Sequence, residues 1–204
     1  MANTSRIFGF RPVKHMNGAP YNGQANVYYV SSAGSNMGVG DIVVTSGAAS
    51  PTGTNSVTTV TAGSNPACGV IVGIINSKQD PIGGTMTTGS VALDTPQYIA
   101  SGSSGYVLVA DSPDLLFEVE TSNGTPGATD VGLNASHANG TFDTTRGISQ
   151  ATVDMGTKAT TAALTLKIWS FVLRPDVDIT AASAKVLVSI NNHQFKGSTG
   201  TAGT

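Results

Sequence analysis

Glycine, proline and small polar residues interrupt this chain in nearly every window that is long enough to form a helix. Apolar residues seldom recur at the three- and four-residue spacing that an amphipathic helix requires. Ser, Thr and Asn also favour turns and caps, because their side chains hydrogen-bond to nearby backbone groups. Short runs of β-branched and aromatic residues remain between the interruptions, and such runs are typical of strands. The sequence therefore predicts an all-β fold, either a β-sandwich or a barrel-like domain.

Clusters of Gly, Pro, Asn, Asp and Ser bound the segments that we expect to form short strands. These segments are residues 26–30, 41–45, 57–61, 68–76, 89–93, 98–100, 106–110, 115–121, 151–154, 164–173 and 185–191. Many short strands with no helices between them fit a sandwich or a barrel.

The chain divides into three parts by composition. Residues 1–25 carry repeated Gly and Pro, so we expect an extended N-terminal arm with no regular element. Residues 26–196 are expected to form the β-rich domain, with a possible break into two subdomains in the loop-like stretch 124–147. Residues 197–204 are polar with nothing to bury, and we expect a flexible tail.

Charge is scarce and unevenly distributed. Charged residues make up 11% of the chain, whereas about a quarter is usual for a soluble domain, and this low density favours a subunit of an assembly. The net charge of −2 argues against a generic nucleic-acid binder and gives no reason to expect a membrane partner. Arg6, Arg11 and Lys14 all precede the first acidic residue, Asp41, so the arm is a basic strip on a mildly acidic body.

The expected strand 115–121 alternates between apolar and acidic residues. Leu115, Phe117 and Val119 share one face, and Glu118 and Glu120 share the other. This pattern predicts a half-buried strand whose two carboxylates face solvent.

The expected strand 164–173 becomes apolar on both faces towards its end. Trp169, Phe171 and Leu173 would line the face opposite the core. We expect this second apolar face to contact another part of the fold or a partner.

No pattern of catalytic or metal-binding residues is apparent. The three histidines stand apart with no Cys partner, and we expect exposed or hydrogen-bonded loop residues rather than a zinc site. No nucleophile elbow, phosphate loop or dinucleotide fingerprint occurs, so we expect neither an enzyme nor a cofactor. Cys68 lies in an apolar run and is expected to be a buried thiol. Neither a signal peptide nor a membrane-spanning helix is expected, and we expect a protein made and kept in soluble form.

Two parts of the chain carry a family resemblance. The segments 8–13 and 17–23 near the start, and 174–176 and 185–194 near the end, resemble small β-rich virion proteins of tailed bacteriophages, of the capsid decoration or cement type. The resemblance implies a β-sandwich or barrel, often a homotrimer, that is made in the bacterial host cytoplasm. It would bind the major capsid protein on the outer surface of the head and hold the lattice against internal pressure.

We expect the contacts to the capsid or to other subunits to come from two places. In the arm, apolar anchors would combine with cations that meet an acidic neighbour, and the second apolar strand face would add further contacts. These residues are Arg6, Ile7, Phe8, Phe10, Arg11, Val13 and Lys14, together with Trp169, Phe171 and Leu173. The alternative is that the arm residues fold back on their own domain.

Two other functions stay open at this stage. Polar β-loops would also suit a receptor- or carbohydrate-binding spike or fibre-type protein, although sugar sites generally use exposed aromatic platforms and Trp169 is the only Trp. A polysaccharide-cleaving enzyme would need carboxylates across a cleft, for which Asp111, Asp114, Glu118 and Glu120 are the candidates.

Overall fold

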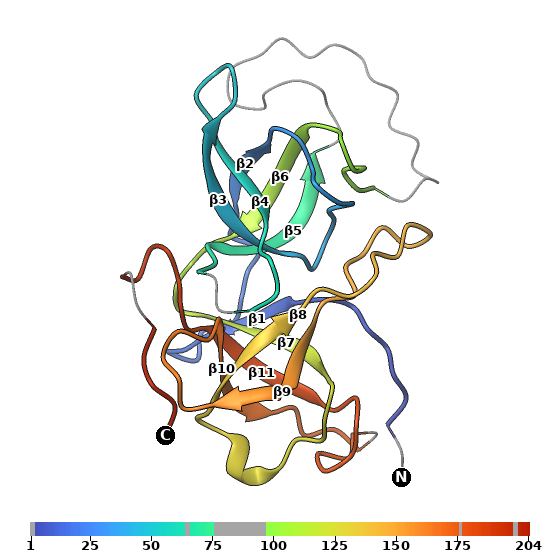
Figure 1. Ribbon diagram of the computed structural model, residues 1–204, viewed down its shortest axis with the longest axis vertical. Coiled ribbons are helices and arrows are strands. Elements are labelled where there is room, and N and C mark those ends of the chain that lie inside the picture. Colours follow the sequence, from blue (N-terminus) through green and yellow to red (C-terminus); the bar gives the residue numbers. More distant parts are fainter. Residues whose placement is uncertain (1–2, 64–65, 76–96, 176, 198–199) are drawn as a thin grey trace.

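The computed structural model describes residues 3–63, 66–75, 97–175, 177–197 and 200–204. Within these residues the chain forms eleven strands and one short 3-10 turn, η1 (Ala128–Asp130), which confirms the all-β prediction. The strands form two groups that lie one above the other along the long axis of the molecule (Figure 1).

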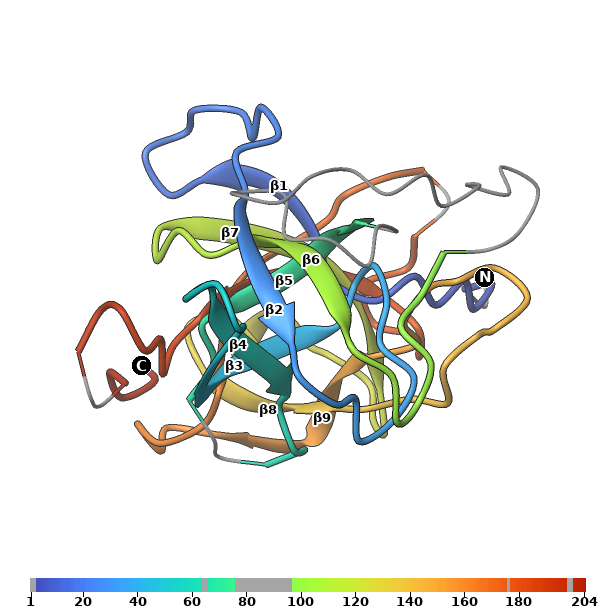
Figure 2. The ribbon, with the colours of Figure 1, turned by 90° about the horizontal axis from the view of Figure 1, so that it is seen from above.

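The first group is a closed barrel in the order β2-β4-β3-β5-β6. Its pairings are antiparallel except for β2 and β4, which pair in parallel through Tyr29 and Ser56 and so close the ring. Figure 2 looks down onto this barrel. The strands are β2 (Asn26–Val30), β3 (Ile42–Ala49), β4 (Asn55–Thr59), β5 (Gly69–Ile75) and β6 (Gly105–Ala110).

The second group is a six-stranded sheet in the order β1-β7-β11-β10-β8-β9. A parallel pairing of β7 with β9, through Thr121 and Val153, joins the sheet into a ring and leaves β1 outside on β7. The strands are β1 (Arg11–His15), β7 (Leu115–Ser122), β8 (Asn134–Ala138), β9 (Thr152–Ala159), β10 (Leu166–Phe171) and β11 (Lys185–Ile190).

A shared apolar core joins the two groups. Ile42 and Val70 of the first barrel belong to the same buried cluster as Leu115 and Phe117 of the second sheet. The N-terminal segment also enters this junction, because the backbone N–H of Phe10 donates to the carbonyl of Gly40 at 2.9 Å. The two groups therefore pack directly on each other.

A glycine permits this close approach of the N-terminal segment. Gly9 has a φ of 70°, and a Cβ atom there would lie 2.7 Å from the carbonyl oxygen of Gly40. Both the left-handed backbone and the close contact exclude larger residues. Phe10 is thereby brought into the core, where it is only 2% exposed.

The strand predictions hold best where the local pattern is strong. Residues 26–30 form β2 with the expected bounds, and most of the other expected segments coincide with strands to within a few residues. The expected strand 98–100 is reduced to one bridge between Ile99 and Met37. The expected strand 89–93 lies outside the described residues.

Two strands form where none was expected. β1 lies inside the predicted arm, and β8 lies inside the loop-like stretch 124–147. β1 exists because it pairs with β7, and its Pro12 is tolerated on this edge strand beside a bulge. β8 buries polar residues, and some of their polar atoms have partners: Asn134 Nδ2 donates to the carbonyls of Thr161 and Thr201. Neither pairing leaves a local signal in the sequence.

The expected segment boundaries also change. The chain begins in the second sheet with β1, enters the barrel with β2, and returns to the second sheet between β6 and β7, at residues 111–114 rather than in 124–147. In the predicted flexible tail, residues 200–204 are held by backbone hydrogen bonds from Gly203 to Thr160 and from Thr204 to Gly132. Asn191 adds a side-chain acceptor for the N–H of Thr201, so the tail does have partners on the second sheet.

Candidate interaction surface

Both faces of β7 are buried. Leu115, Phe117 and Val119 face the core as expected, but Glu118 and Glu120 are each only 2% exposed, so the prediction of solvated carboxylates is wrong. The residues before β1 and those around the ends of β10 and β11 cover the acidic face of the strand and provide the partners of the carboxylates. The alternation of apolar and acidic residues within one strand does not show whether distant parts of the chain cover its acidic face.

Glu118 lies at the centre of a branched ion pair. Its Oε2 atom accepts hydrogen bonds from Nη2 of Arg11 at 2.7 Å and from Nη2 of Arg174 at 2.9 Å. Arg11 lies directly opposite Glu118 in the pairing of β1 with β7, and Arg174 follows β10. The Oε1 atom of Glu118 is buried and has no hydrogen-bond partner within the described residues.

Glu120 is satisfied at both oxygens. Its Oε2 accepts from Lys185 Nζ at 2.9 Å and from the backbone N–H of Arg6 at 2.9 Å, and its Oε1 accepts from Ser5 Oγ at 2.7 Å. Burial by itself raises the pKa of Glu120, but the hydrogen bonds from Lys185, Ser5 and Arg6 outweigh it and hold this pKa below its usual value. The N-terminal segment is therefore tied to its own domain at Glu120.

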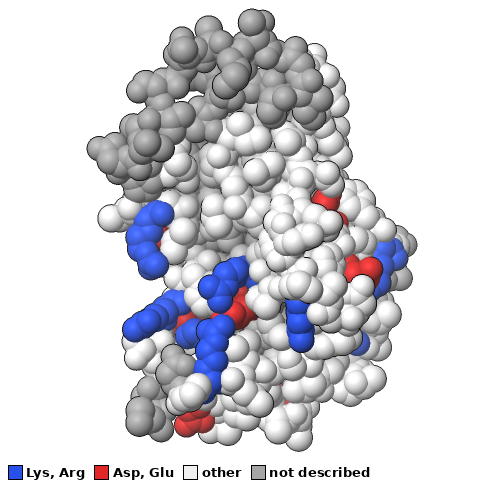
Figure 3. Space-filling view, turned by 180° about the vertical axis from the view of Figure 1, so that it is seen from behind, with Lys and Arg blue, Asp and Glu red and all other residues white. Residues whose placement is uncertain are grey.

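A hollow of about 330 Å³ opens over this ion-pair network, and we call it the basic hollow. Four of the ten Lys and Arg residues of the chain line it, together with Glu118. These four are Arg6, Arg11, Arg174 and Lys185. Figure 3 shows basic side chains gathered around acidic atoms on this side of the lower half, in a surface that is otherwise largely uncharged.

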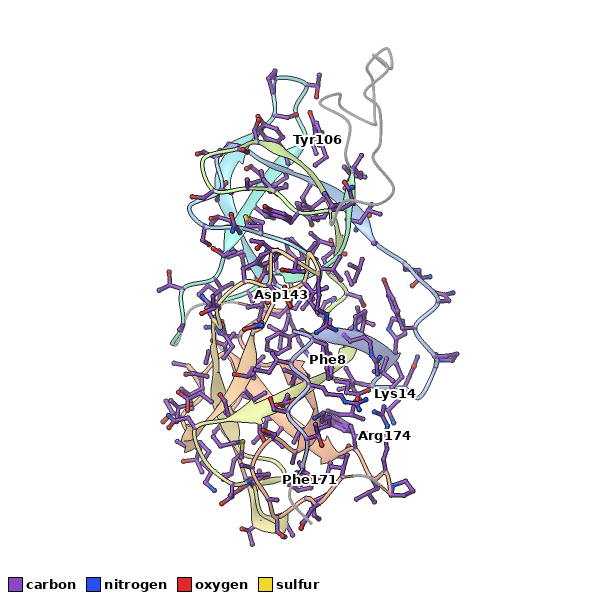
Figure 4. The ribbon with its side chains drawn as sticks, turned by 90° about the vertical axis from the view of Figure 1, so that its right-hand side faces the viewer. Phe8, Lys14, Tyr106, Asp143, Phe171 and Arg174 are labelled. Atoms are coloured by element: carbon purple, nitrogen blue, oxygen red, sulfur yellow. The ribbon has the colours of Figure 1, made fainter. Side chains whose placement is uncertain are left out.

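A second hollow of about 290 Å³, which we call the apolar hollow, adjoins the basic one through two residues. Phe8 and Arg11 line both hollows, and the guanidinium carbon of Arg11 lies 5.3 Å from the centre of the Phe8 ring. The rest of the apolar hollow is formed by Phe10, Pro12, Tyr21, Val39, Ile71 and Val72. We refer to the two hollows together as the arm face, and Figure 4 shows Phe8 and Arg174 on this side of the molecule.

The arm residues proposed as contacts divide between this surface and the interior. Arg6, Phe8 and Arg11 line the basic hollow. Phe10 is buried in the core and contributes only to the lining of the apolar hollow. Val13, at the bulge of β1, is 37% exposed. The half-buried Ile7 and Lys14 line neither hollow.

The expected second apolar face of β10 is divided by a bulge. The pairing of β10 with β11 skips Trp169, so Ser170 takes the place that Trp169 would have had in a regular ladder. Trp169 points outward and is 43% exposed, whereas Phe171 packs against the core. Leu173 lies beyond the strand and is 79% exposed. These three residues therefore do not form one continuous face.

Trp169 instead borders a hollow of its own, of about 340 Å³. Its polar lining comes from β10, β11 and the end of the chain. The residues are Lys167, Ser189, Asn191, Lys196 and Thr201. We call this the Trp169 hollow.

The remaining candidate carboxylates are Asp111 and Asp114, and both lie close enough to His193 to influence its pKa. No group of three or more His, Cys, Asp or Glu side chains within the described residues could hold a metal ion. Asp111 accepts hydrogen bonds from Asn26 and Tyr28, and Asp114 lies on the surface, 3.9 Å from Lys196. The candidate carboxylates of a polysaccharide-cleaving enzyme thus have separate partners.

Buried groups occupy the junction between the two strand groups. His137 in β8 and His193 after β11 are each 1% exposed, and each is hydrogen-bonded, so the hydrogen-bonded alternative of the expectation holds, although His137 lies in a strand rather than a loop. Both residues bridge to the segment between β4 and β5. Cys68 is buried as predicted, and burial raises the pKa of its thiol to about 12.

Comparisons with known proteins found no matching family model, and neither the curated proteins nor the solved structures contained a significant match. In the part of the chain that the structure describes, none of the helical segments has the length and apolar character needed to cross a membrane.

Proposed function

We propose that this chain is a structural protein of the capsid decoration or cement type, which binds the major capsid protein on the outer surface of a phage head. The observation that carries the proposal is the arm face, where Arg6, Phe8 and Arg11 meet Arg174 at two adjoining hollows. The N-terminal and C-terminal segments that resemble the phage family converge on this surface. It presents cations next to apolar side chains.

The rest of the molecule is consistent with a binding role. Two groups of strands around a shared core form the support, and the ion pair of Arg11 with Glu118 and the hydrogen bonds of Ser5 and Arg6 to Glu120 hold the N-terminal segment against it. A support of this kind presents its surface with little loss of conformational entropy on binding. The proposed contact residues thus act as a preformed surface rather than as a free arm.

The decisive experiment adds the purified protein to phage shells that lack it and measures co-sedimentation and heat resistance. A ligand that binds only the assembled shell stabilises it by about 2.7 kcal/mol per site at a hundredfold excess over Kd. We expect saturable binding and disruption at a higher temperature. Absence of binding, or equal heat resistance of coated and bare shells, would remove this function.

We further propose that the protein acts as a homotrimer, because three contacts on one lattice reinforce each other once the first has formed. Exposed Leu173, Trp169 and Phe195 offer apolar surface for association. Sedimentation equilibrium at micromolar concentration tests this directly. A mass of 20.6 kDa there, that of one chain, would contradict it.

The Trp169 hollow supports a second candidate function, a carbohydrate-binding spike or fibre-type protein. An exposed indole next to hydroxyl, amide and amino groups is the arrangement that a sugar ring stacks on and hydrogen-bonds to. Because Trp169 is the only Trp, its fluorescence reports on this hollow alone. A saturable change in emission with bacterial surface oligosaccharides, abolished in Trp169→Ala, would favour this function over the first.

A further inference from the structure

The basic hollow has more positive charge than its own carboxylates neutralise. Arg11 and Arg174 share a single oxygen atom of Glu118, and Lys185 is paired with Glu120. The exposed side chain of Arg6 forms no ion pair within the described residues. Among the described residues, four cations therefore face two carboxylates, and the guanidinium groups retain N–H donors for an incoming anion.

One residue that lines the hollow carries an unused acceptor. Glu118 lines it, and the Oε1 atom of this residue is buried with no partner among the described residues. A buried acceptor without a donor costs free energy, so a ligand that brings an N–H group gains by supplying one. Inorganic phosphate carries no N–H group and could offer only its own O–H. A peptide segment with an acidic side chain carries both a carboxylate and backbone N–H groups.

The apolar hollow lies where the neighbouring side chain of such a segment would fall. It shares Phe8 and Arg11 with the basic hollow, and its floor includes the buried side chains of Phe10 and Ile71. An apolar side chain that enters it removes apolar surface from water, which is favourable. The two hollows thus recognise two adjacent features of one ligand.

We infer that the arm face binds a segment of a partner protein in which an Asp or Glu stands next to a large apolar residue. The carboxylate lies between Arg6, Arg11 and Arg174, and a backbone N–H of the segment donates to Oε1 of Glu118. The apolar side chain enters the apolar hollow beside Phe8. The inference rests on the proposed function and names the chemistry that the protein recognises on its partner.

A capped peptide, acetyl-Leu-Glu-Leu-amide, is the probe for the intact protein. Its matched control, acetyl-Leu-Gln-Leu-amide, differs only in the charge, and inorganic phosphate tests for a simple anion site. Titrations followed by the side-chain Nε–Hε signals of Arg11 and Arg174 should show saturable shifts with the Glu peptide. The shifts should weaken between about 0.05 M and about 0.5 M salt, because screening lengths shorten. Equal shifts with the Gln peptide, saturation by phosphate alone, or no shift up to about 5 mM peptide would overturn the inference.

Two substitutions move the affinity in opposite directions. Arg6→Gln removes a cation that holds no ion pair, so the fold is retained and binding of the Glu peptide should weaken about two- to fivefold. Glu118→Gln keeps an acceptor in place but frees Arg11 and Arg174, so binding should strengthen. Arg146→Gln, an exposed arginine outside both hollows, is the matched control and should change nothing. If Glu118→Gln does not fold, Arg6→Gln decides, and unchanged affinity in that variant would contradict the inference.

The same variants separate this inference from the proposed function. If shells bind wild-type protein and Arg6→Gln equally well, the shell contact lies elsewhere and only the inference fails. If shells do not bind the wild-type protein at all, the proposed function fails, while the peptide titration still shows whether the arm face takes an acidic segment.

Discussion

Lys185 on β11 lies directly opposite Glu120 on β7, and its ammonium nitrogen is 2.9 Å from the carboxylate of Glu120 in the interior of the protein. The side chains of this pair are 10% and 2% exposed, so water contributes little to either charge. Removing one partner of such a pair is costly, because the other charge stays buried.

We expect Lys185→Met to lower the free energy of unfolding by about 3 to 5 kcal/mol. The double variant Lys185→Met with Glu120→Leu should recover most of this loss, since no unpaired charge remains. Urea unfolding followed by Trp169 fluorescence measures both. Lys196→Met, at the exposed contact with Asp114, is the matched control and should cost less than about 1 kcal/mol. A loss for Lys185→Met as small as that of the control would show that Glu120 is not buried as described.

The N-terminal segment should contribute to stability through Phe10. We expect Phe10→Ala to destabilise the protein by about 3 to 5 kcal/mol, because it leaves a cavity in the core that both strand groups share. Val13→Ala, at an exposed position of the neighbouring strand, should change the free energy of unfolding by less than about 0.5 kcal/mol. Thermal unfolding of both variants tests this. Equal stabilities would mean that the segment is a detachable arm, as the sequence predicts.

His193 should make the protein sensitive to acid. Burial lowers the pKa of His193 to about 4; Asp111 opposes this shift, and Lys196 adds to it. The unfolded chain takes up this proton near pH 6.5, so the free energy of unfolding falls as pH drops from about 6.5 to about 4, by up to about 3 kcal/mol. In His193→Gln, the free energy of unfolding measured with urea should depend less on pH over this interval. An unchanged slope would contradict a buried neutral His193.

Asp41 should act in the opposite direction. Burial raises the pKa of Asp41 to about 6, against hydrogen bonds from Ser149 and from the backbone N–H of Gly38. The folded protein therefore holds a proton that the unfolded chain loses near pH 4, and stability falls as pH rises through this range, by up to about 3 kcal/mol.

Asp41→Asn removes this charge and keeps an acceptor for Gly38. The increase in its free energy of unfolding over that of the wild type should be small near pH 4 and reach its full size above about pH 6. Measuring the free energy of unfolding against pH for Asp41→Asn, for His193→Gln and for the double variant shows whether the two pH dependences offset each other in the wild type. A gain that does not depend on pH would exclude ionisation of Asp41 as its cause.

The local pattern of the chain predicted the strand class and several strand positions well. Residues 26–30 form β2 with the bounds expected, and Cys68 is buried in the apolar run that suggested it. These features depend on alternation, β-branched residues and turn residues within a few positions of each other, so they can be predicted from the sequence alone.

The candidate surface was only partly predictable. The acid-free composition of residues 1–25 identified Arg6, Phe8 and Arg11 as contact candidates. Arg174, Lys185 and the role of Glu118 were missed, because these residues meet only when β1, β7 and β11 pair. No spacing in the sequence marks a pairing between residues more than a hundred positions apart, such as Arg11 and Glu118.

The sequence alone determined that this chain forms short strands with small polar turns, because backbone preferences and side-chain alternation act locally. Only the tertiary structure decided which faces are covered. It converted an expected arm into β1, buried Glu118 and Glu120 under that segment, and turned Trp169 outward at a bulge. The physical reason is that burial and ion pairing depend on which distant segments pack together, and the same local pattern is compatible with either a solvated or a covered face.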